Sequence, residues 1–238
     1  MREPLAPGAR LELPEPVVRH AVRVLRLPTG TPITLFDGRG GEYPAVLEYV
    51  DRDYAYAVVG AWLERECESP LRVTLVQAVQ AGDKMDYTIQ KAVELGVDNI
   101  IPVESRRSVI RLTGDRAAKR VAHWQGVVAS ACEQCGRNRL PLVAPLEGLD
   151  KWFARPRSSA LRLMLAPGAA TTLSALPPAA EVELLVGAEG GLDEREVEAA
   201  RLAGFTAIRL GPRVLRTETA GLAALAALQI LWGDFNHV

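Results

Sequence analysis

The sequence predicts an α/β protein in which a small β-rich domain precedes a larger domain built on a parallel sheet. Short apolar runs separated by turn signals fill residues 1–68, a pattern typical of a small barrel or curled sheet. From residue 71, apolar strands alternate with segments whose apolar residues recur at helical spacing. Because strands that alternate with helices form mostly parallel sheets covered on both faces, residues 71–238 are predicted to form one α/β domain.

The first domain is predicted to contain three short strands, over Thr31–Phe36, Glu42–Val50 and Tyr54–Trp62. Glycine-rich and acidic turns at 37–41 and 51–53 separate these strands. The segment Glu64–Pro70 is charged and ends in proline, so the domain boundary is placed there.

In the second domain the predicted strands are Leu71–Val79, Val97–Val103, Leu161–Leu165, Glu183–Val186 and Thr206–Leu210. The predicted helices are Asp83–Leu95, Asp115–Gln134, a helix that begins after Asp193, and Thr217–Trp232. Asp193 with Glu196 three residues later forms a capping-box pattern, and Gly204 is the natural end of that helix.

The composition excludes several classes of protein. The 238 residues are 48% hydrophobic and 24% charged with a net charge of -1, so the chain is globular and carries no overall basic field. Three cysteines are too few for a disulfide framework, and Cys132 and Cys135 lack the further ligands of a zinc site. The N-terminus has no signal-peptide core, and the longest apolar stretch is too short to span a membrane. We therefore expect a cytoplasmic protein without a membrane segment or a metal.

Unusual segments follow the ends of three predicted strands, at 163–168 (LMLAPG), 186–191 (VGAEGG) and 210–219 (LGPRVLRTET). Ligands of parallel α/β sheets bind beyond the carboxyl ends of the strands, and glycine lets backbone groups approach a ligand closely. The sequence contains no Walker loop, Rossmann fingerprint, zinc-protease motif or serine-hydrolase elbow. The pattern favours a nucleoside-like ligand held largely by main-chain groups; for each glycine taken alone, simple turn formation is the alternative.

Four blocks of the sequence resemble the bacterial 16S ribosomal RNA uracil-N3 methyltransferases, a family of the SPOUT (trefoil-knot) class. They are HAVRVLRLPTGTPITLFDGRGGEYPA, AGDKMDYTIQKAVELGVDNIIPVESRRSV, WQGVVASACEQCGRNRLPLV and LVGAEGGLDEREVEAARLAGFTAIRLGPRVLRTETAGLAALAALQ. One departure is Ala188, where the family usually has the proline of G-P-E-G-G. The resemblance implies a PUA-like RNA-binding barrel over residues 1–68 and a SPOUT domain with a C-terminal trefoil knot over residues 71–238.

The resemblance also implies S-adenosylmethionine as methyl donor, bound by the knot loops of a homodimer that acts on 16S ribosomal RNA within the assembled 30S subunit. The residues expected to bind the cofactor are Leu165, Ala166, Val186, Gly187, Glu189, Gly190, Gly191, Leu210, Gly211, Leu215, Arg216 and Thr219. The last helix is apolar almost all round between Thr219 and Leu231, more than one buried face requires, so it is the predicted dimer interface.

Methylation of uracil N3 requires loss of the N3 proton and stabilisation of the resulting anion. Arg216 is expected to stabilise that anion, and Glu218 and Glu189 are the candidate proton acceptors. An exposed ion pair between Arg216 and Glu218 is the structural alternative. Thr217 has a competing role as the N-cap of the last helix.

Basic residues within the matched blocks are expected to bind RNA phosphates. In the second domain these are Arg106, Arg107, Arg137 and Arg139, with the neutral Asn138 among them, and in the first domain His20, Arg23 and Arg26. Two other functions stay open at this stage. One is a transfer-RNA methyltransferase of the same knotted class, and the other is a non-catalytic RNA-binding assembly factor, against which cofactor binding would weigh.

Overall fold

The computed structural model describes residues 4–156 and 159–236, and contacts divide the chain into two compact units. The first unit runs to Glu68 and takes in Gly136–Leu140 as well, and the second unit holds Ser69–Cys135 and the chain from Pro141 onward. The sequence prediction had placed Gly136–Leu140 with the second domain, because the long helix before them belongs there. Ion pairs between residues of this segment and Glu66 and Glu68 hold it to the first unit.

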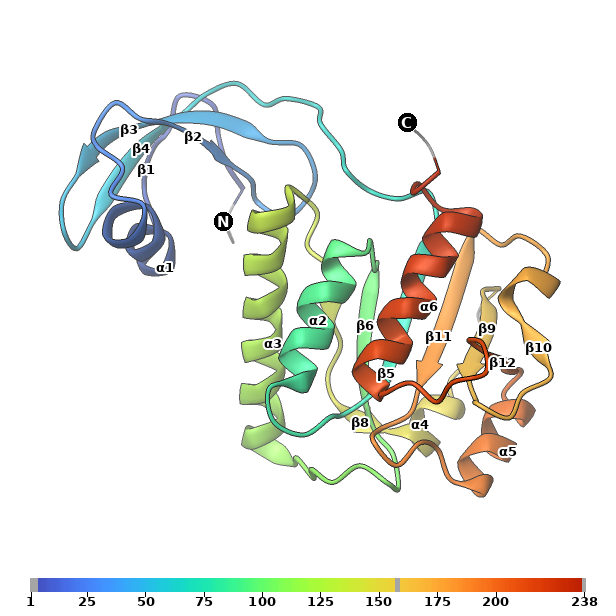
Figure 1. Cartoon of the computed structure of the whole chain (residues 1–238). Coiled ribbons are helices and arrows are strands. Elements are labelled where there is room, and N and C mark those ends of the chain that lie inside the picture. The colour runs from blue at the N-terminus through green and yellow to red at the C-terminus, as the bar shows by residue number, and fades with distance from the viewer. Residues whose placement is uncertain (1–3, 157–158, 237–238) are drawn as a thin grey trace. The chain divides into compact units, whose positions relative to one another are not determined.

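The first unit is built on a four-stranded antiparallel sheet in the order β1-β4-β3-β2 (Figure 1). Its strands are β1 (Arg10–Glu12), β2 (Pro32–Leu35), β3 (Tyr43–Val50) and β4 (Ala55–Val59), and its helices are α1 (Glu15–Val18) and the π-helical turn η1 (Arg19–Val24). Alternate residues of the two inner strands, such as Leu47 and Ala57, are fully buried. The sequence prediction missed β1 and α1, since each is too short to show a periodic apolar pattern.

The second unit is built on an eight-stranded sheet in the order β10-β12-β9-β11-β5-β6-β7, with β8 paired to β6. The strands are β5 (Arg72–Ala78), β6 (Asn99–Glu104), β7 (Leu142–Val143), β8 (Glu147–Gly148), β9 (Leu161–Leu165), β10 (Thr171–Thr172), β11 (Glu181–Val186) and β12 (Thr206–Arg209). Every pairing is parallel. The α/β class predicted from the alternating pattern is confirmed.

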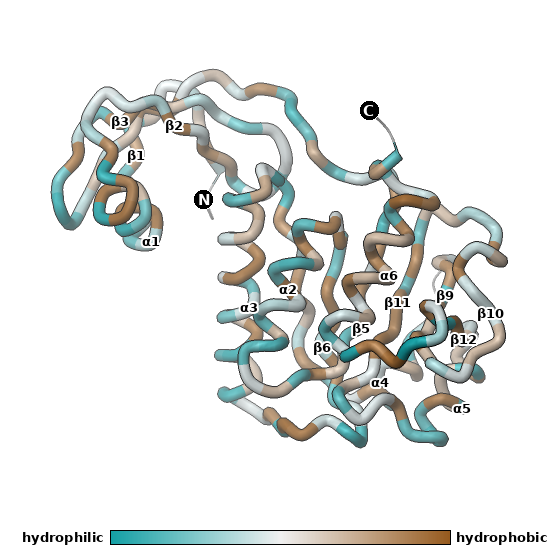
Figure 2. The backbone as a smooth tube through the Cα atoms, viewed as in Figure 1, coloured by the Kyte–Doolittle hydropathy of each residue, from teal (hydrophilic) through white to brown (hydrophobic). Residues whose placement is uncertain are grey.

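Helices cover both faces of this sheet. They are α2 (Lys84–Glu94), α3 (Gly114–Cys135), α4 (Leu149–Phe153), α5 (Glu194–Leu202) and α6 (Thr217–Trp232), with a 3-10 turn η2 (Leu173–Ala175). On the central strand β5, Val76 and Ala78 belong to the core that includes Phe205, whereas Leu75 and Gln77 face Gly221 of α6. Side chains of a strand alternate between the two faces of a sheet, and here both faces are covered. For this reason β5 and its neighbour β11 are apolar along most of their length (Figure 2).

The order of the strands places the predicted ligand loops together. Strand β9 pairs with β11 on one side and with β12 on the other, so the carboxyl ends of all three lie side by side. The segments that follow these strands therefore meet at one edge of the sheet. The trefoil knot that the resemblance implies stays a prediction.

Candidate cofactor and catalytic site

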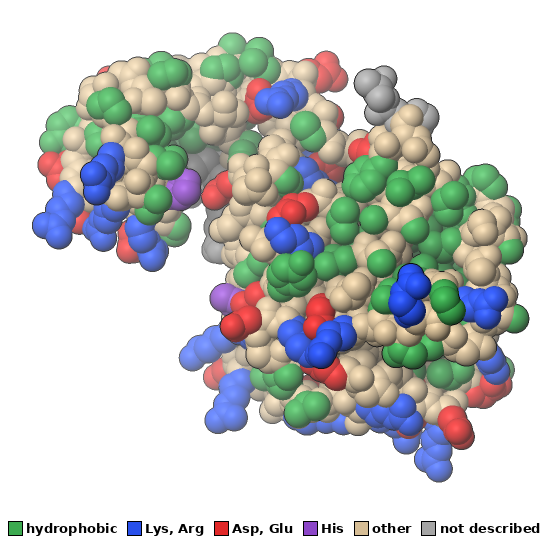
Figure 3. All heavy atoms as spheres, viewed as in Figure 1, with side chains coloured by type: hydrophobic (Ala, Val, Ile, Leu, Met, Phe, Trp, Pro, Cys, Tyr) green, Lys and Arg blue, Asp and Glu red, His purple; other side chains and the backbone are tan. Residues whose placement is uncertain are grey.

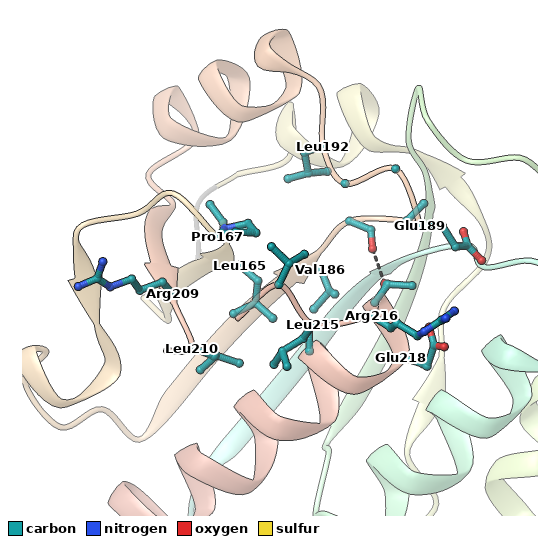
Figure 4. Close-up of a pocket in the computed structure, with 18 of the residues that line it drawn as sticks. Leu165, Pro167, Val186, Glu189, Leu192, Arg209, Leu210, Leu215, Arg216 and Glu218 are labelled. Carbon is teal, nitrogen blue, oxygen red and sulfur yellow. Dashed lines mark hydrogen bonds between the residues drawn. The ribbon is translucent and has the colours of Figure 1, made fainter. Parts of the chain in front are cut away.

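A cavity of about 520 Å³ lies at the carboxyl ends of β9, β11 and β12 (Figure 4). Of the residues predicted to bind the cofactor, all but Thr219 line it: Leu165, Ala166, Val186, Gly187, Glu189, Gly190, Gly191, Leu210, Gly211, Leu215 and Arg216. Thr219 lies on the exposed side of α6. The spacing of these loops in the sequence could not show which side of the last helix would face the cavity.

One part of the cavity is apolar. The side chains of Leu165, Val186, Leu210 and Leu215 gather there (Figure 4). Leu165 ends β9, Val186 ends β11, and the other two belong to the segment after β12. Such a surface suits a flat apolar group, whose polar edge can reach the backbone groups of the same loops.

The backbone of the glycine-rich loop is packed against itself. A Cβ atom at Gly187 would lie 2.8 Å from the carbonyl carbon of Gly191 and 2.9 Å from the amide nitrogen of Leu192. Gly191 has a φ of 69°, and its N–H donates to the carbonyl of Ala188 at 2.8 Å, which closes a tight turn. Glycine at 187 therefore allows the close approach of two backbone segments, and glycine at 191 supplies the left-handed turn.

The opposite part of the cavity is charged. Lys84, at the start of α2, places its Nζ 3.7 Å from Oε1 of Glu189 and 3.8 Å from Oε1 of Glu218. The backbone N–H of Ala81 donates to the same oxygen of Glu189 at 3.0 Å. The second oxygen of Glu218 is buried and has no partner among the residues that the structure describes. The sequence analysis missed Lys84, although it lies in the matched block AGDKMDYT.

Arg216 lies beside Glu218 at this charged part (Figure 4). It is exposed, and within residues 4–156 and 159–236 its guanidinium makes no hydrogen bond or ion pair. The structural alternative, an Arg216–Glu218 pair, is not formed, because Lys84 is the cation that faces Glu218. A guanidinium without an internal partner is available to a substrate.

Arg216, and not Thr217, is the N-cap residue of α6, and no side chain caps this helix. The hydroxyl of Thr217 instead donates to the carbonyl of Gly187 at 2.5 Å. The expectation that Thr217 serves as the N-cap is therefore wrong. The local sequence did not reveal this contact, because Gly187 lies thirty positions away on another loop.

The basic loop after β6 reaches the same cavity. Nη1 of Arg107 donates to the carbonyl of Gly190 at 2.7 Å, and Arg107 lines the cavity. The backbone N–H of Arg106 donates to the buried carboxylate of Glu196 at 2.7 Å, and Nε of Arg106 lies 3.7 Å from Asp193. Because Glu196 and Asp193 form the capping box of α5, the helix N-terminus and the basic loop hold each other in place.

Arg137, Asn138 and Arg139 are engaged within the first unit. Nη2 of Arg137 lies 2.5 Å from Glu68, Nδ2 of Asn138 donates to the carbonyl of Arg65, and Nε of Arg139 lies 2.9 Å from Glu66. The hydrogen bond from Arg139 lowers the pKa of the Glu66 carboxyl. Only 5% of Arg137 and 3% of Asn138 are exposed, so these contacts argue against direct binding of RNA phosphates by these two residues.

The other predicted basic contacts of the first unit lie at its surface. His20, Arg23 and Arg26 are exposed, and Arg23 pairs with Asp53 at 2.6 Å. Figure 3 shows several Lys and Arg side chains together on one side of the first unit. An exposed ion pair contributes little to stability, so Arg23 can exchange Asp53 for a phosphate at low cost.

No helix in the described part of the chain is long and apolar enough to cross a membrane. The same residues contain no group of three or more His, Cys, Asp or Glu side chains placed to hold a metal ion. Cys132 and Cys135 occupy successive turns of α3, and Cys132 is buried.

Comparison with known proteins gives the class to which the chain belongs. A family model described as an RNA methyltransferase domain matches residues 67–229, and one described as an RNA methyltransferase PUA domain matches residues 13–60. The chain is 40% identical over 173 residues to the ribosomal RNA small subunit methyltransferase E of Buchnera aphidicola from Schizaphis graminum, covering 72% of this chain and 70% of that protein. It is 32% identical over 231 residues to the protein of that name from Bacillus subtilis, covering 91% and 90%.

Solved structures agree with this result. The ribosomal RNA small subunit methyltransferase E of Neisseria gonorrhoeae bound to S-adenosyl methionine is 45% identical with a TM-score of 0.94, covering 99% of this chain and 98% of that one. A Legionella pneumophila methyltransferase in complex with the same cofactor is 36% identical with a TM-score of 0.92, covering 98% and 96%.

Fold, cavity and matches together define an RNA methyltransferase with an N-terminal PUA domain. Within that class, the chain belongs to the ribosomal RNA small subunit methyltransferase E family. The resemblance inferred from the sequence is confirmed.

The packing at Gly187 predicts that Gly187→Ala weakens binding of S-adenosylmethionine at least tenfold, because the new Cβ displaces the backbone at 191 and 192. Isothermal titration calorimetry measures the affinity. Gly126→Ala is the matched control, since a Cβ there meets nothing within 4 Å and Gly126 lies on α3, outside the cavity. Unchanged affinity in Gly187→Ala would show that the cofactor does not bind against this loop.

Proposed function

We propose that this protein transfers a methyl group from S-adenosylmethionine to N3 of a uridine in 16S ribosomal RNA. The observation that carries the proposal is the charged part of the cavity, where the free guanidinium of Arg216 lies beside the partly unpartnered carboxylate of Glu218. Methylation of uracil N3 needs both groups, because a cation stabilises the negative charge of the deprotonated base and a carboxylate accepts the N3 proton. The names of the relatives support ribosomal RNA as substrate over transfer RNA.

The cavity fits the cofactor. The leucines at 165, 210 and 215 provide apolar walls for the adenine ring. At the glycine-rich loop, the residues at 187, 190 and 191 have no side chains, so backbone groups face the ligand there. Relatives of the same fold that bind S-adenosylmethionine support this choice of cofactor. When bound, S-adenosylmethionine supplies an electrophilic methyl group on a sulfonium centre.

Arg216 and Glu218 act on the uracil. The guanidinium of Arg216 donates hydrogen bonds to O2 or O4 and stabilises the negative charge that develops when N3 loses its proton. Glu218 is the better proton acceptor of the two candidates, because one of its oxygens has no partner in the described residues, whereas Glu189 already accepts from Ala81. Lys84 lies between both carboxylates and fixes their orientation.

The basic loop binds the RNA backbone next to the chemistry. Arg106 and Arg107 lie on a loop that contacts the cavity through Gly190, so phosphates held there place a nucleotide at the cavity mouth. N3 lies on the Watson–Crick edge, so the target base is unpaired or flipped out of its helix. The exposed His20, Arg23 and Arg26 of the first unit provide a second contact set. The substrate is the assembled 30S subunit in the cytoplasm.

A homodimer forms through α6. Its buried side faces its own sheet, and its other side presents a stripe of small and apolar residues: Thr219, Leu222, Ala223, Ala226, Ile230 and Leu231. The first five of these positions recur at helical spacing and form one apolar strip along the helix, and Leu231 lies beside it.

Arg216→Ala is expected to lower the single-turnover rate at saturating RNA roughly a hundredfold, by analogy with loss of one oxyanion donor. The product is quantified as N3-methyluridine by mass spectrometry of 16S RNA. Arg201→Ala is the control, because Arg201 pairs with Glu198 on the surface of α5 and should leave the rate unchanged. A normal saturated rate for Arg216→Ala would contradict the role of Arg216.

Arg106→Ala is expected to weaken RNA binding and to reduce the slope of log affinity against log salt by about one phosphate contact. The saturated rate should stay close to that of the wild type, since Arg106 does not line the cavity. Fluorescence anisotropy across a salt series measures the slope. An unaltered slope would mean that Arg106 does not bind a phosphate.

Light scattering at micromolar concentration is expected to give twice the chain mass for the wild type. Ala223→Glu places a charge in the apolar strip and should yield a monomer, because the interface would bury an unpaired carboxylate. Leu202→Glu, on the exposed face of α5, should remain a dimer. A monomeric wild-type protein would contradict the proposed interface.

A further inference from the structure

We propose that Thr217 is a positioning residue for the cofactor loop, held by a buried chain of hydrogen bonds that begins at Thr88 on α2. The inference rests on the cofactor site of the proposed function, and it adds Thr217, which lines the cavity, and three residues that lie outside it. Gln77, Gln80 and Thr88 do not line the cavity, so their effect on it would pass through Thr217.

The chain is continuous. Thr88 Oγ1 donates to Oε1 of Gln80 at 2.9 Å, and Nε2 of Gln80 donates to Oγ1 of Thr217 at 3.3 Å. Nε2 of Gln77 donates to the same hydroxyl at 3.2 Å, and Thr217 donates onward to the carbonyl of Gly187 at 2.5 Å. Thr88 and Gln77 are completely buried, Gln80 is 1% exposed and Thr217 8% exposed.

The hydrogen atoms of this chain have one consistent arrangement. A threonine hydroxyl has one hydrogen to donate and two lone pairs that accept, and an amide nitrogen only donates. With two amide nitrogens donating to Thr217, its own hydrogen is directed to Gly187. The hydroxyl of Thr88 holds the carbonyl end of Gln80, which leaves the nitrogen end facing Thr217. Donation therefore runs in one direction, from α2 to the end of β11.

This contact fixes a backbone group that has no side chain to anchor it. Gly187 follows the last residue of β11, where ladder pairing ends, and the Thr217 hydroxyl orients its carbonyl. Thr217 also lies directly between Arg216 and Glu218 in the chain. One side chain thus sets the position of the cofactor loop relative to the two groups proposed to act on the uracil, and such placement governs reaction rates.

Removing the hydroxyl has a defined consequence. In Thr217→Val the carbonyl of Gly187 and Nε2 of Gln80 lose a buried partner, whereas Nε2 of Gln77 keeps its contact with the carbonyl of Ala78. A buried polar group left without a partner moves to find one. The loop that begins at Gly187 follows the end of β11, where ladder pairing stops, so the loss of this contact shifts the loop and not the strand.

The experiment measures the affinity for S-adenosylmethionine by calorimetry in the absence of RNA, together with thermal unfolding. Thr217→Val should bind about tenfold or more weakly, and Thr217→Ser, which keeps the hydroxyl, should bind within about threefold of the wild type. Thr88→Val should lose about threefold or more, although it contacts no ligand.

Ser69→Ala is the matched control. It removes a hydroxyl that donates to Oε1 of Gln229 at 2.7 Å, near the other end of α6, and should lower the unfolding temperature without changing the affinity. This separates positioning of the loop from general stability of the helix.

The proposal is overturned if Thr217→Val binds the cofactor within twofold of the wild type, or if Thr217→Ser binds as weakly as Thr217→Val. Should Thr217→Val fail to fold, Thr88→Val tests the proposal instead. Unchanged cofactor affinity in Thr88→Val overturns the proposed chain of hydrogen bonds, and weakened affinity in a folded protein supports it. Because RNA is absent, these results do not depend on the methylated position. A wild-type protein that binds the cofactor but leaves uracil N3 unmodified would overturn the proposed function alone.

Discussion

The parallel pairing of β9 with both β11 and β12 is the constraint on which the site depends. Parallel strands end at the same edge, so three loops that are separated in the sequence meet without any direct attraction between them. A sheet with β12 beside another strand would move Leu210 and Arg216 away from the glycine-rich loop. The position of the cavity is therefore set by the order of the strands, and its lining residues then determine what it can bind.

The charged part of the cavity depends on a different element. Lys84 comes from α2, which follows the central strand β5, and it faces Glu189 of one loop and Glu218 of α6. Two carboxylates this close to one cation leave the site with a negative excess that Arg216 offsets. Because Lys84 is the cation facing Glu218, Arg216 stays free for a substrate.

The sequence predicted the α/β class and the cavity loops well, because apolar strands and glycine-rich strand ends are local patterns. Strand β1 and helix α4 were not predicted, since each is too short for a period to show. The contacts of Lys84 and Thr217 could not be predicted from the neighbouring sequence, because their partners lie on other elements. The two arginines at 137 and 139 predicted an RNA-binding surface, yet Arg137 is buried against Glu68, because a charge in the sequence does not reveal its partner.

Helix α6 combines requirements that conflict in an ordinary surface helix. Its first turn holds Thr217 and Glu218 at the cavity, Gly221 packs against Leu75 and Gln77 of β5, and its far side is apolar. A helix apolar on both sides would be a liability in water unless its second side were covered. Covering it in a dimer would restrain the helix that carries the two groups proposed to act on the uracil, so the dimer interface and the proposed chemistry would lie on the same helix. The proposed dimer would also account for the absence from α6 of the charged face expected of a helix in a monomer.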